Sequence, residues 1–251
     1  MLTLVKLLAK PKLNEPVLIC GLPGSGYVGK VAVDHLISEL KAQPLATIYS
    51  HSFPPQVLVK SDGSVELMKH EVKYWQSQDN VKDLLLYTGD SQPVTPEAEY
   101  ELSNRVLDLA EEFGVKRVFT LAAYITGQFT QSPKVFGTAT ETTFLKELAK
   151  EGVNTMSEGS ITGMNGIVIG LAAIRGMVGT CLLGETSGYI IDPRASYVVL
   201  EVLMKILGIN VDLAGLEARA KQSEAIGRMI EEGRTSPQEK RTPERELGYI
   251  S

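Results

Sequence analysis

Residues 16–40 read PVLICGLPGSGYVGKVAVDHLISEL, and this stretch decides the fold. It begins with an apolar run, Pro16–Cys20, of the kind found in strands that are buried on both faces of a sheet. A glycine-rich turn follows, and apolar residues then recur at helical spacing, at Gly29, Val33, Leu36, Ile37 and Leu40. A buried strand that turns sharply into a helix is typical of a parallel α/β sheet.

The same alternation continues along the chain. Strands are predicted at 45–49, 83–87, 116–122 and 177–183, and helices at 96–113, 144–148, 165–175, 193–207 and 213–232. Thr95-Pro96 and Asp192-Pro193 mark two helix starts, because proline at the first helical position lacks only an amide hydrogen that would be unpaired. Thr138 and Glu141 stand at capping-box spacing ahead of another helix. We therefore predict a single three-layer α/β/α domain over residues 1–233, with a mostly parallel sheet.

One insertion departs from this alternation. Gln56–Lys60 and Val65–Lys69 are short strand-like runs on either side of Ser61–Ser64, which contains an Asp-Gly pair. An Asp-Gly turn between short strands is a hairpin signal. We predict a β-hairpin that projects from the main sheet.

Charge and composition exclude several function classes. Lys and Arg total 25 against 30 Asp and Glu, and the net charge of −5 without a basic stripe argues against a nucleic-acid-binding protein. The longest apolar stretch, Ile167–Ile174, is far shorter than the roughly 20 residues that cross a bilayer. Cys20 and Cys181 lie in apolar runs and are predicted to be buried, and no secretory signal pattern precedes them. We expect no membrane contact and a cytoplasmic location.

The glycine turn resembles two nucleotide-binding patterns and completes neither. Gly24–Gly29 fits the dinucleotide fingerprint, but no acidic residue ends the second strand to bind the ribose. Gly24–Lys30 fits the P-loop except at its last position, where Val31 replaces the Ser or Thr that ligates magnesium. We predict no cofactor, and we interpret the glycines as allowing a sharp turn and close packing of the helix on the sheet.

An anion or small ligand could still bind beside this turn. Open α/β sheets place ligands at the carboxyl ends of their strands, so the predicted pocket consists of Gly24, Ser25, Gly26, Gly29, Asp90 and Glu185. The three histidines have no metal-ligand spacing, which predicts that no metal is bound. No arrangement of nucleophile, base and orienting acid is found. Two functions remain open, a non-catalytic scaffold or chaperone and a hydrolase or nucleotide-handling enzyme that uses this pocket.

Residues 234–251 differ in composition from the rest of the chain. Arg234–Glu246 contains two prolines, seven charged residues and no apolar residue, which predicts a flexible charged tail. The final residues are apolar again. We predict that this tip binds a protein partner through Leu247, Tyr249, Ile250 and Ser251.

Six segments in the same order resemble one family over about residues 15–230. They are Gly21–Gly29, Phe53–Pro55, Tyr87–Pro93, Leu121–Gly127, Ile161–Gly166 and Cys181–Tyr189, and Asp192-Pro193 follows them. The chain resembles archaeal members of the proteasome assembly chaperone family, which are related to the second of the eukaryotic assembly chaperones. The resemblance implies a fold similar to purine nucleoside phosphorylases and peptidyl hydrolases, with no established catalytic centre.

The resemblance also implies partners. Archaeal members form oligomers, and some bind proteasome α subunits through a hydrophobic–tyrosine–any motif at the C-terminus. Here Tyr249 is third from the end and follows Gly248, so the terminal carboxylate is one residue out of register with that motif. We expect the partner to be proteasome α subunits or another protein complex. We also expect a homo-oligomer, with the glycine-rich, apolar region Gly163–Gly179 in or near the interface.

Overall fold

The computed structural model describes residues 3–78 and 82–235 of the 251-residue chain. Within these residues, the main sheet has nine strands: β1 (Thr3–Leu7), β2 (Val17–Gly21), β3 (Gln43–Ser50), β6 (His70–Trp75), β7 (Leu84–Gly89), β8 (Arg117–Ile125), β9 (Val135–Ala139), β10 (Asn154–Thr155) and β11 (Val178–Thr186). The helices are η1 (Ser25–Tyr27), α1 (Val28–Glu39), α2 (Pro96–Glu112), α3 (Thr142–Lys150), α4 (Met164–Ile174), α5 (Pro193–Leu207) and α6 (Ala214–Thr235).

The centre of the sheet is parallel, as the sequence predicts. The strand order is β1-β3-β6-β7-β2-β8-β11-β9-β10, and β7, β2, β8 and β11 run in the same direction. Ile19 of β2 lies between Leu86 of β7 and Phe119 of β8. All five residues of β2 are buried, which explains its uninterrupted apolar sequence.

Antiparallel strands extend the sheet on both sides. β6 pairs antiparallel with β7, β3 with β6, and β1 with β3, while β9 pairs antiparallel with β11 on the other side. The sequence patterns did not indicate β1, β6, β9 or β10. The sheet is therefore mixed, with a parallel centre and antiparallel flanks.

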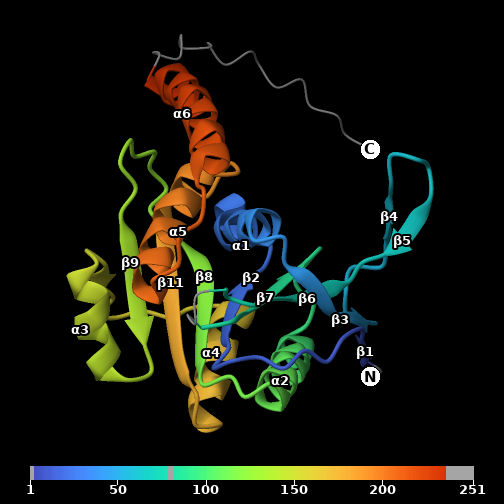
Figure 1. The fold of residues 1–251 in the computed structure, drawn as a ribbon. Helices are drawn as coiled ribbons and strands as arrows, with labels where there is room; N and C mark the ends of the chain where they lie inside the picture. Colours follow the sequence, from blue (N-terminus) through green and yellow to red (C-terminus); the bar gives the residue numbers. More distant parts are fainter. Residues whose placement is uncertain (1–2, 79–81, 236–251) are drawn as a thin grey trace, which may run out of the picture.

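Helices cover both faces, which confirms the three-layer α/β/α prediction (Figure 1). Alternate residues of β2 divide between two hydrophobic cores, because neighbouring side chains on a strand point to opposite faces. Ile19 packs with α1 and α5, whereas Leu18 and Cys20 pack with α2 and α4. α6 packs on α5 through its first turns, where Leu216 is fully buried.

The predicted helix starts are largely confirmed. α2 begins after Thr95, whose Oγ1 accepts a hydrogen bond from Ala98 N at 3.3 Å, and α5 begins at Pro193. The capping-box prediction is wrong. Thr138 lies inside β9, and α3 begins after Glu141 without a side-chain cap.

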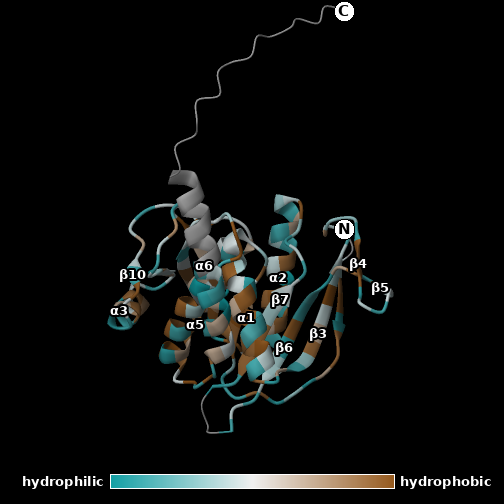
Figure 2. Cartoon of the chain, turned by 90° about the horizontal axis from the view of Figure 1, so that it is seen from above, coloured by the Kyte–Doolittle hydropathy of each residue, from teal (hydrophilic) through white to brown (hydrophobic). Residues whose placement is uncertain are grey.

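The predicted hairpin is present and stands beside the main sheet (Figure 1, Figure 2). Among the described strands, β4 (Val57–Val59) and β5 (Val65–Leu67) pair only with each other. Gly63 closes the turn with a φ of +82°, a conformation that favours glycine.

The structure bears on two predicted absences, of a membrane-spanning helix and of a metal site, only for the residues it describes. No described helix is long and apolar enough to cross a membrane, and no cluster of possible metal ligands occurs in the described part of the chain. Cys20 and Cys181 are buried and unpaired, and burial raises the pKa of the Cys181 thiol to about 12. α6 continues to Thr235, and the rest of the predicted tail, 236–251, lies outside the described residues.

Candidate functional site

The glycine turn allows β2, α1 and β8 to pack in close contact. A Cβ on Gly21 would lie 2.1 Å from the Gly29 carbonyl oxygen, and a Cβ on Gly29 would lie 2.0 Å from the Leu121 carbonyl oxygen. Both distances are far below van der Waals contact. Gly26, with a φ of +63°, and Tyr27, at +52°, reverse the chain between β2 and α1. The interpretation of these glycines as packing and turn residues is therefore confirmed.

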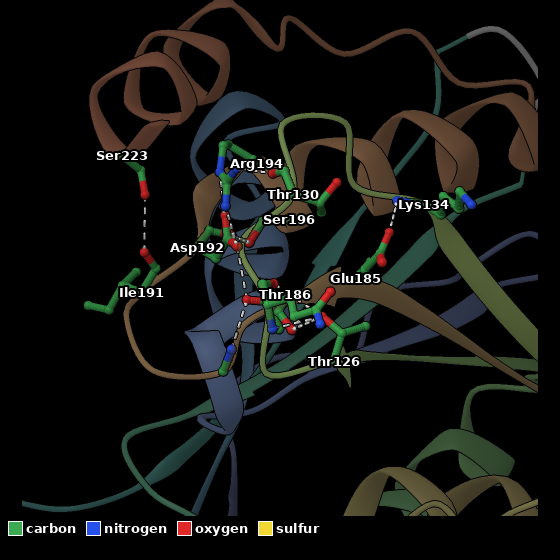
Figure 3. A network of polar contacts seen from close by, with 12 residues as sticks. Thr126, Thr130, Lys134, Glu185, Thr186, Ile191, Asp192, Arg194, Ser196 and Ser223 are labelled. Carbon is green, nitrogen blue, oxygen red and sulfur yellow. Dashed lines mark hydrogen bonds and ion pairs between the residues drawn. The ribbon is translucent and has the colours of Figure 1, made fainter. Parts of the chain in front are cut away.

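A buried polar network fixes the turn from the side of α5 (Figure 3). Asp192 N donates a hydrogen bond to the Gly26 carbonyl oxygen at 2.8 Å. Thr186 Oγ1 at the end of β11 donates to Asp192 Oδ2 at 2.9 Å. The position of the glycine turn thus depends on the junction between β11 and α5.

The centre of this network is an ion pair. Arg194 Nε donates to Asp192 Oδ1 at 3.0 Å, and Arg194 Nη2 to Asp192 Oδ2 at 2.9 Å. Asp192 is 0% exposed and Arg194 is 6% exposed, so solvent screens the pair very little. The guanidinium also donates to the Thr130 carbonyl oxygen and lies 3.8 Å from the centre of the Phe129 ring. The pair therefore ties the loop after β8 to α5.

A cleft of about 700 Å³ opens beside the glycine turn, at the carboxyl ends of β2 and β8. The turn, the end of β8 and the segment that leads into α4 form its walls. Gln92 joins two of these walls, since its Nε2 donates to the Pro23 carbonyl oxygen at 2.7 Å and its Oε1 accepts from Met164 N at 3.4 Å. The cleft occupies the part of an open α/β sheet where ligands commonly bind.

The charges that line the cleft favour hydrogen-bond donors over anions. Among the described residues, the ionisable carboxylates in the lining are Glu99 and Glu158, and no Lys, Arg or His lines it. Asn165 Oδ1 is buried and has no hydrogen-bond partner among the described residues, which leaves a free acceptor in the wall. Lys30, the phosphate-binding position of the P-loop pattern, instead contacts Asp34 Oδ2 at 2.8 Å. A phosphate would meet two carboxylates here and no cation.

The structure brings together three of the six predicted pocket residues. Gly24, Ser25 and Gly29 line the cleft. Gly26 instead packs against Thr186. The two predicted carboxylates, Asp90 and Glu185, bind backbone amides instead. Asp90 Oδ2 accepts from Lys69 N at 3.0 Å, and Glu185 Oε2 accepts from Lys134 N at 3.0 Å.

Gln92, Asn165 and Glu99 are among the lining residues that were not predicted from the sequence. Gln92 and Asn165 belong to segments that carry the family resemblance, and that resemblance could have identified them. Glu99 lies on α2 and has no local signal, because only the fold brings it to the cleft.

A second buried polar group lies at the end of β7. His70 Nε2 contacts the Ser91 carbonyl oxygen at 2.7 Å, and His70 Nδ1 contacts the Tyr87 hydroxyl. Because a carbonyl oxygen only accepts, the proton is on Nε2, and Tyr87 donates to Nδ1. Burial lowers the pKa of His70 to about 4, so the imidazole is neutral at physiological pH. A Cβ on Gly89 would lie 2.1 Å from His70 Cδ2, which explains the glycine at the end of β7.

A family model described as the PAC2 family matches residues 18–228. The chain belongs to the PAC2 family. PbaB of Pyrococcus furiosus, described as an archaeal proteasome activator, is 37% identical, with a TM-score of 0.85 over 91% of this chain and 98% of that one. PbaA of the same organism, described as an archaeal homolog of proteasome-assembly chaperone, is 29% identical, with a TM-score of 0.75 over 92% of both chains.

A curated sequence supports the same relationship. The uncharacterized protein MJ1210 of Methanocaldococcus jannaschii is 35% identical over 243 residues, which cover 95% of this chain and 93% of the relative. The resemblance to archaeal proteasome assembly chaperone homologues is thus confirmed, and so is the fold that this resemblance implies. The span of the family model, 18–228, includes the glycine turn and all the residues that line the cleft.

Proposed function

We propose that this PAC2 protein is a non-catalytic, oligomeric chaperone or scaffold that binds proteasome α subunits. The observation that carries the proposal is the 37% identity to PbaB, described as a proteasome activator, over 91% of this chain. The 29% identity to PbaA, described as a homolog of proteasome-assembly chaperone, supports the same partner class. Such a partner would place the protein in the cytoplasm.

The chemistry of the cleft supports a non-catalytic role. The described residues that line it include serines and two glutamates, but no histidine, cysteine or lysine. Hydrolases that use serine require a base bonded to the hydroxyl. The buried imidazole of His70 is already bonded to Tyr87 and Ser91 and does not line the cleft.

We further propose that the tail supplies the contact with the partner. α6 begins against α5 and leads into the predicted tail, whose tip contains Leu247, Tyr249, Ile250 and Ser251. Three large apolar side chains within four residues suit a small hydrophobic pocket. In an oligomer several tips would bind together and gain avidity.

The test is capture of proteasome α subunits by the full chain and by a variant that lacks Leu247–Ser251. We expect the deletion to abolish capture while thermal stability and oligomer mass stay unchanged. A matched control, Gln238→Ala, changes a polar residue of the same tail and should capture normally. Equal capture by the deletion variant would contradict the role of the tail. Failure of the full chain to capture α subunits would contradict the proposed partner and favour another protein complex.

A further inference from the structure

The outward face of α4 is apolar and has no cover within the described chain. Residues 164–174 contain no charged side chain. One side of the helix packs into the cores through Met164, Val168 and Ala172. On the other side, Ile174 is 83% exposed. Ile167 and Leu171 beside it are partly exposed, so the face presents a contiguous apolar surface, and such surfaces mark interaction sites.

A groove runs beside this face. Its volume is about 680 Å³, and it lies between α4, the end of β9 and the segment 156–161. Most of its lining is small or apolar, with Ala139, Met156, Ile161 and Leu171 among the contributors. The only charged residue of the described chain that lines it is Glu158. The groove therefore suits an aliphatic side chain.

Gly170 lies in the middle of the exposed face, and the fold of one chain gives no reason for it. A Cβ at Gly170 would meet nothing within 4 Å. In contrast, a Cβ at Gly166, one turn earlier, would lie 2.0 Å from the Ile161 carbonyl oxygen. Glycine within a helix costs about 1 kcal/mol relative to alanine. A glycine at this position is explained if another backbone packs closely against the helix there, because a larger side chain would block the approach.

We propose that α4 packs against α4 of a second copy of this chain, antiparallel about a two-fold axis near Gly170. Each Ile174 enters the groove of the other copy. The absence of charge on the face favours a second copy as the occupant. In a two-fold contact, residues near the axis lie beside the same residues of the other copy, so any charge there would face a like charge. The same helix also carries both the exposed side chain and the groove that fits it.

The charges around the face fit this arrangement. Arg175 follows Ile174, and its guanidinium binds Asp108 Oδ1 of α2 at 2.8 Å, so it does not fold over α4. Antiparallel packing places this basic end of each helix towards the Glu158 end of the other groove. Tyr100, which is exposed on α2, lines the groove and adds an aromatic side chain to the contact.

The inference rests on the oligomer in the proposed function, and the first experiment separates the two. Light scattering after gel filtration should give the natural chain at least twice its mass of 27.3 kDa. Ile174→Asp and Gly170→Leu should raise the dissociation constant of the α4 contact about a hundredfold, while the circular dichroism stays unchanged. Val94→Asp places the same charge at an exposed apolar residue that does not line the groove and should keep the natural mass.

The second experiment tests the geometry directly. Cys20 and Cys181 are buried, so Gly170→Cys introduces an accessible thiol near the proposed axis. Mild oxidation should convert this variant to a disulfide-linked dimer on a non-reducing gel, and Val94→Cys should stay monomeric on the same gel.

Three results would overturn the inference. If the natural chain is monomeric, both the proposed oligomer and the α4 interface are contradicted. If the natural chain is an oligomer, its mass is unchanged in Ile174→Asp and Gly170→Leu, and Gly170→Cys does not cross-link, only the α4 interface is contradicted. Loss of proteasome capture in Ile174→Asp at unchanged oligomer mass assigns the face to that partner instead.

Discussion

Lowering the pH from 7 to 5 is expected to destabilise this protein through the buried imidazole of His70. The folded state holds the ring neutral, with Nε2–H donated to Ser91 and Nδ1 accepting from Tyr87. A second proton would go to Nδ1 and remove the acceptor that Tyr87 uses, whereas the bond from Nε2–H to Ser91 would remain. Burial lowers the pKa of His70 from its ordinary 6.5 to about 4.

The sign and size of the effect follow from these two pKa values. Between pH 6.5 and 4 the unfolded chain binds a proton that the folded chain does not, so unfolding becomes more favourable as the pH falls. The contribution of His70 is fully present above pH 6.5 and is lost as the pH falls towards 4. One pKa unit corresponds to about 1.4 kcal/mol, which gives a loss of about 2 kcal/mol between pH 7 and pH 5.

The assay is urea unfolding at several pH values, for the natural chain and for His70→Gln. Glutamine does not titrate, so the variant should be less stable at pH 7 and should lose none of this contribution on acidification. The difference in unfolding free energy between the two proteins should narrow by about 2 kcal/mol from pH 7 to pH 5. A difference that stays constant across this range would refute the assignment of a low pKa to His70.

Two further predictions concern the glycine turn and the network that fixes it. Asp192→Ala leaves the Arg194 guanidinium buried without its counter-ion and should lower the free energy of unfolding, measured in urea, by about 3–5 kcal/mol. Asp192→Ala combined with Arg194→Leu should recover part of this loss. A cost of Asp192→Ala alone below about 1 kcal/mol would contradict the role of the pair. Gly29→Ala should be strongly destabilising, because its Cβ would lie 2.0 Å from a backbone oxygen of β8. Gly24→Ala should keep the natural melting temperature, because the nearest atom to its Cβ would be 3.7 Å away. Equal melting temperatures for the two variants would contradict the role of Gly29 in close packing.

The sequence predicts strands most readily where their environment is uniform along their length. β2 was recognisable because both of its faces are buried, so every residue is apolar. β6 was missed because His70, Glu71 and Lys73 give it a polar sequence, although His70 is fully buried. The partners that make this burial possible, Tyr87 and Ser91, come from another part of the chain, and no local pattern shows them.

The same limit applies to the site. Gly24, Ser25 and Gly29 could be predicted because one short turn presents all three. Position at a strand end also indicated Asp90 and Glu185, but position does not tell whether a carboxylate faces a cleft or binds a backbone amide. The positions of Glu99 and of the cleft residues in the segment that leads into α4 depend on how α2 and α4 pack on the sheet, which only the assembled fold determines.

The bond from Asp192 to Gly26 also has a consequence for how the chain folds. It joins residues separated by more than half of the sequence, and closing so long a loop carries a large entropic cost that must precede the contact. During synthesis the glycine turn leaves the ribosome long before α5, so its carbonyl group stays without this partner until the C-terminal half has docked. The cleft should therefore be among the last parts of the domain to take its final shape, and slow or incomplete docking of α5 would leave the turn exposed to other polypeptides in the meantime.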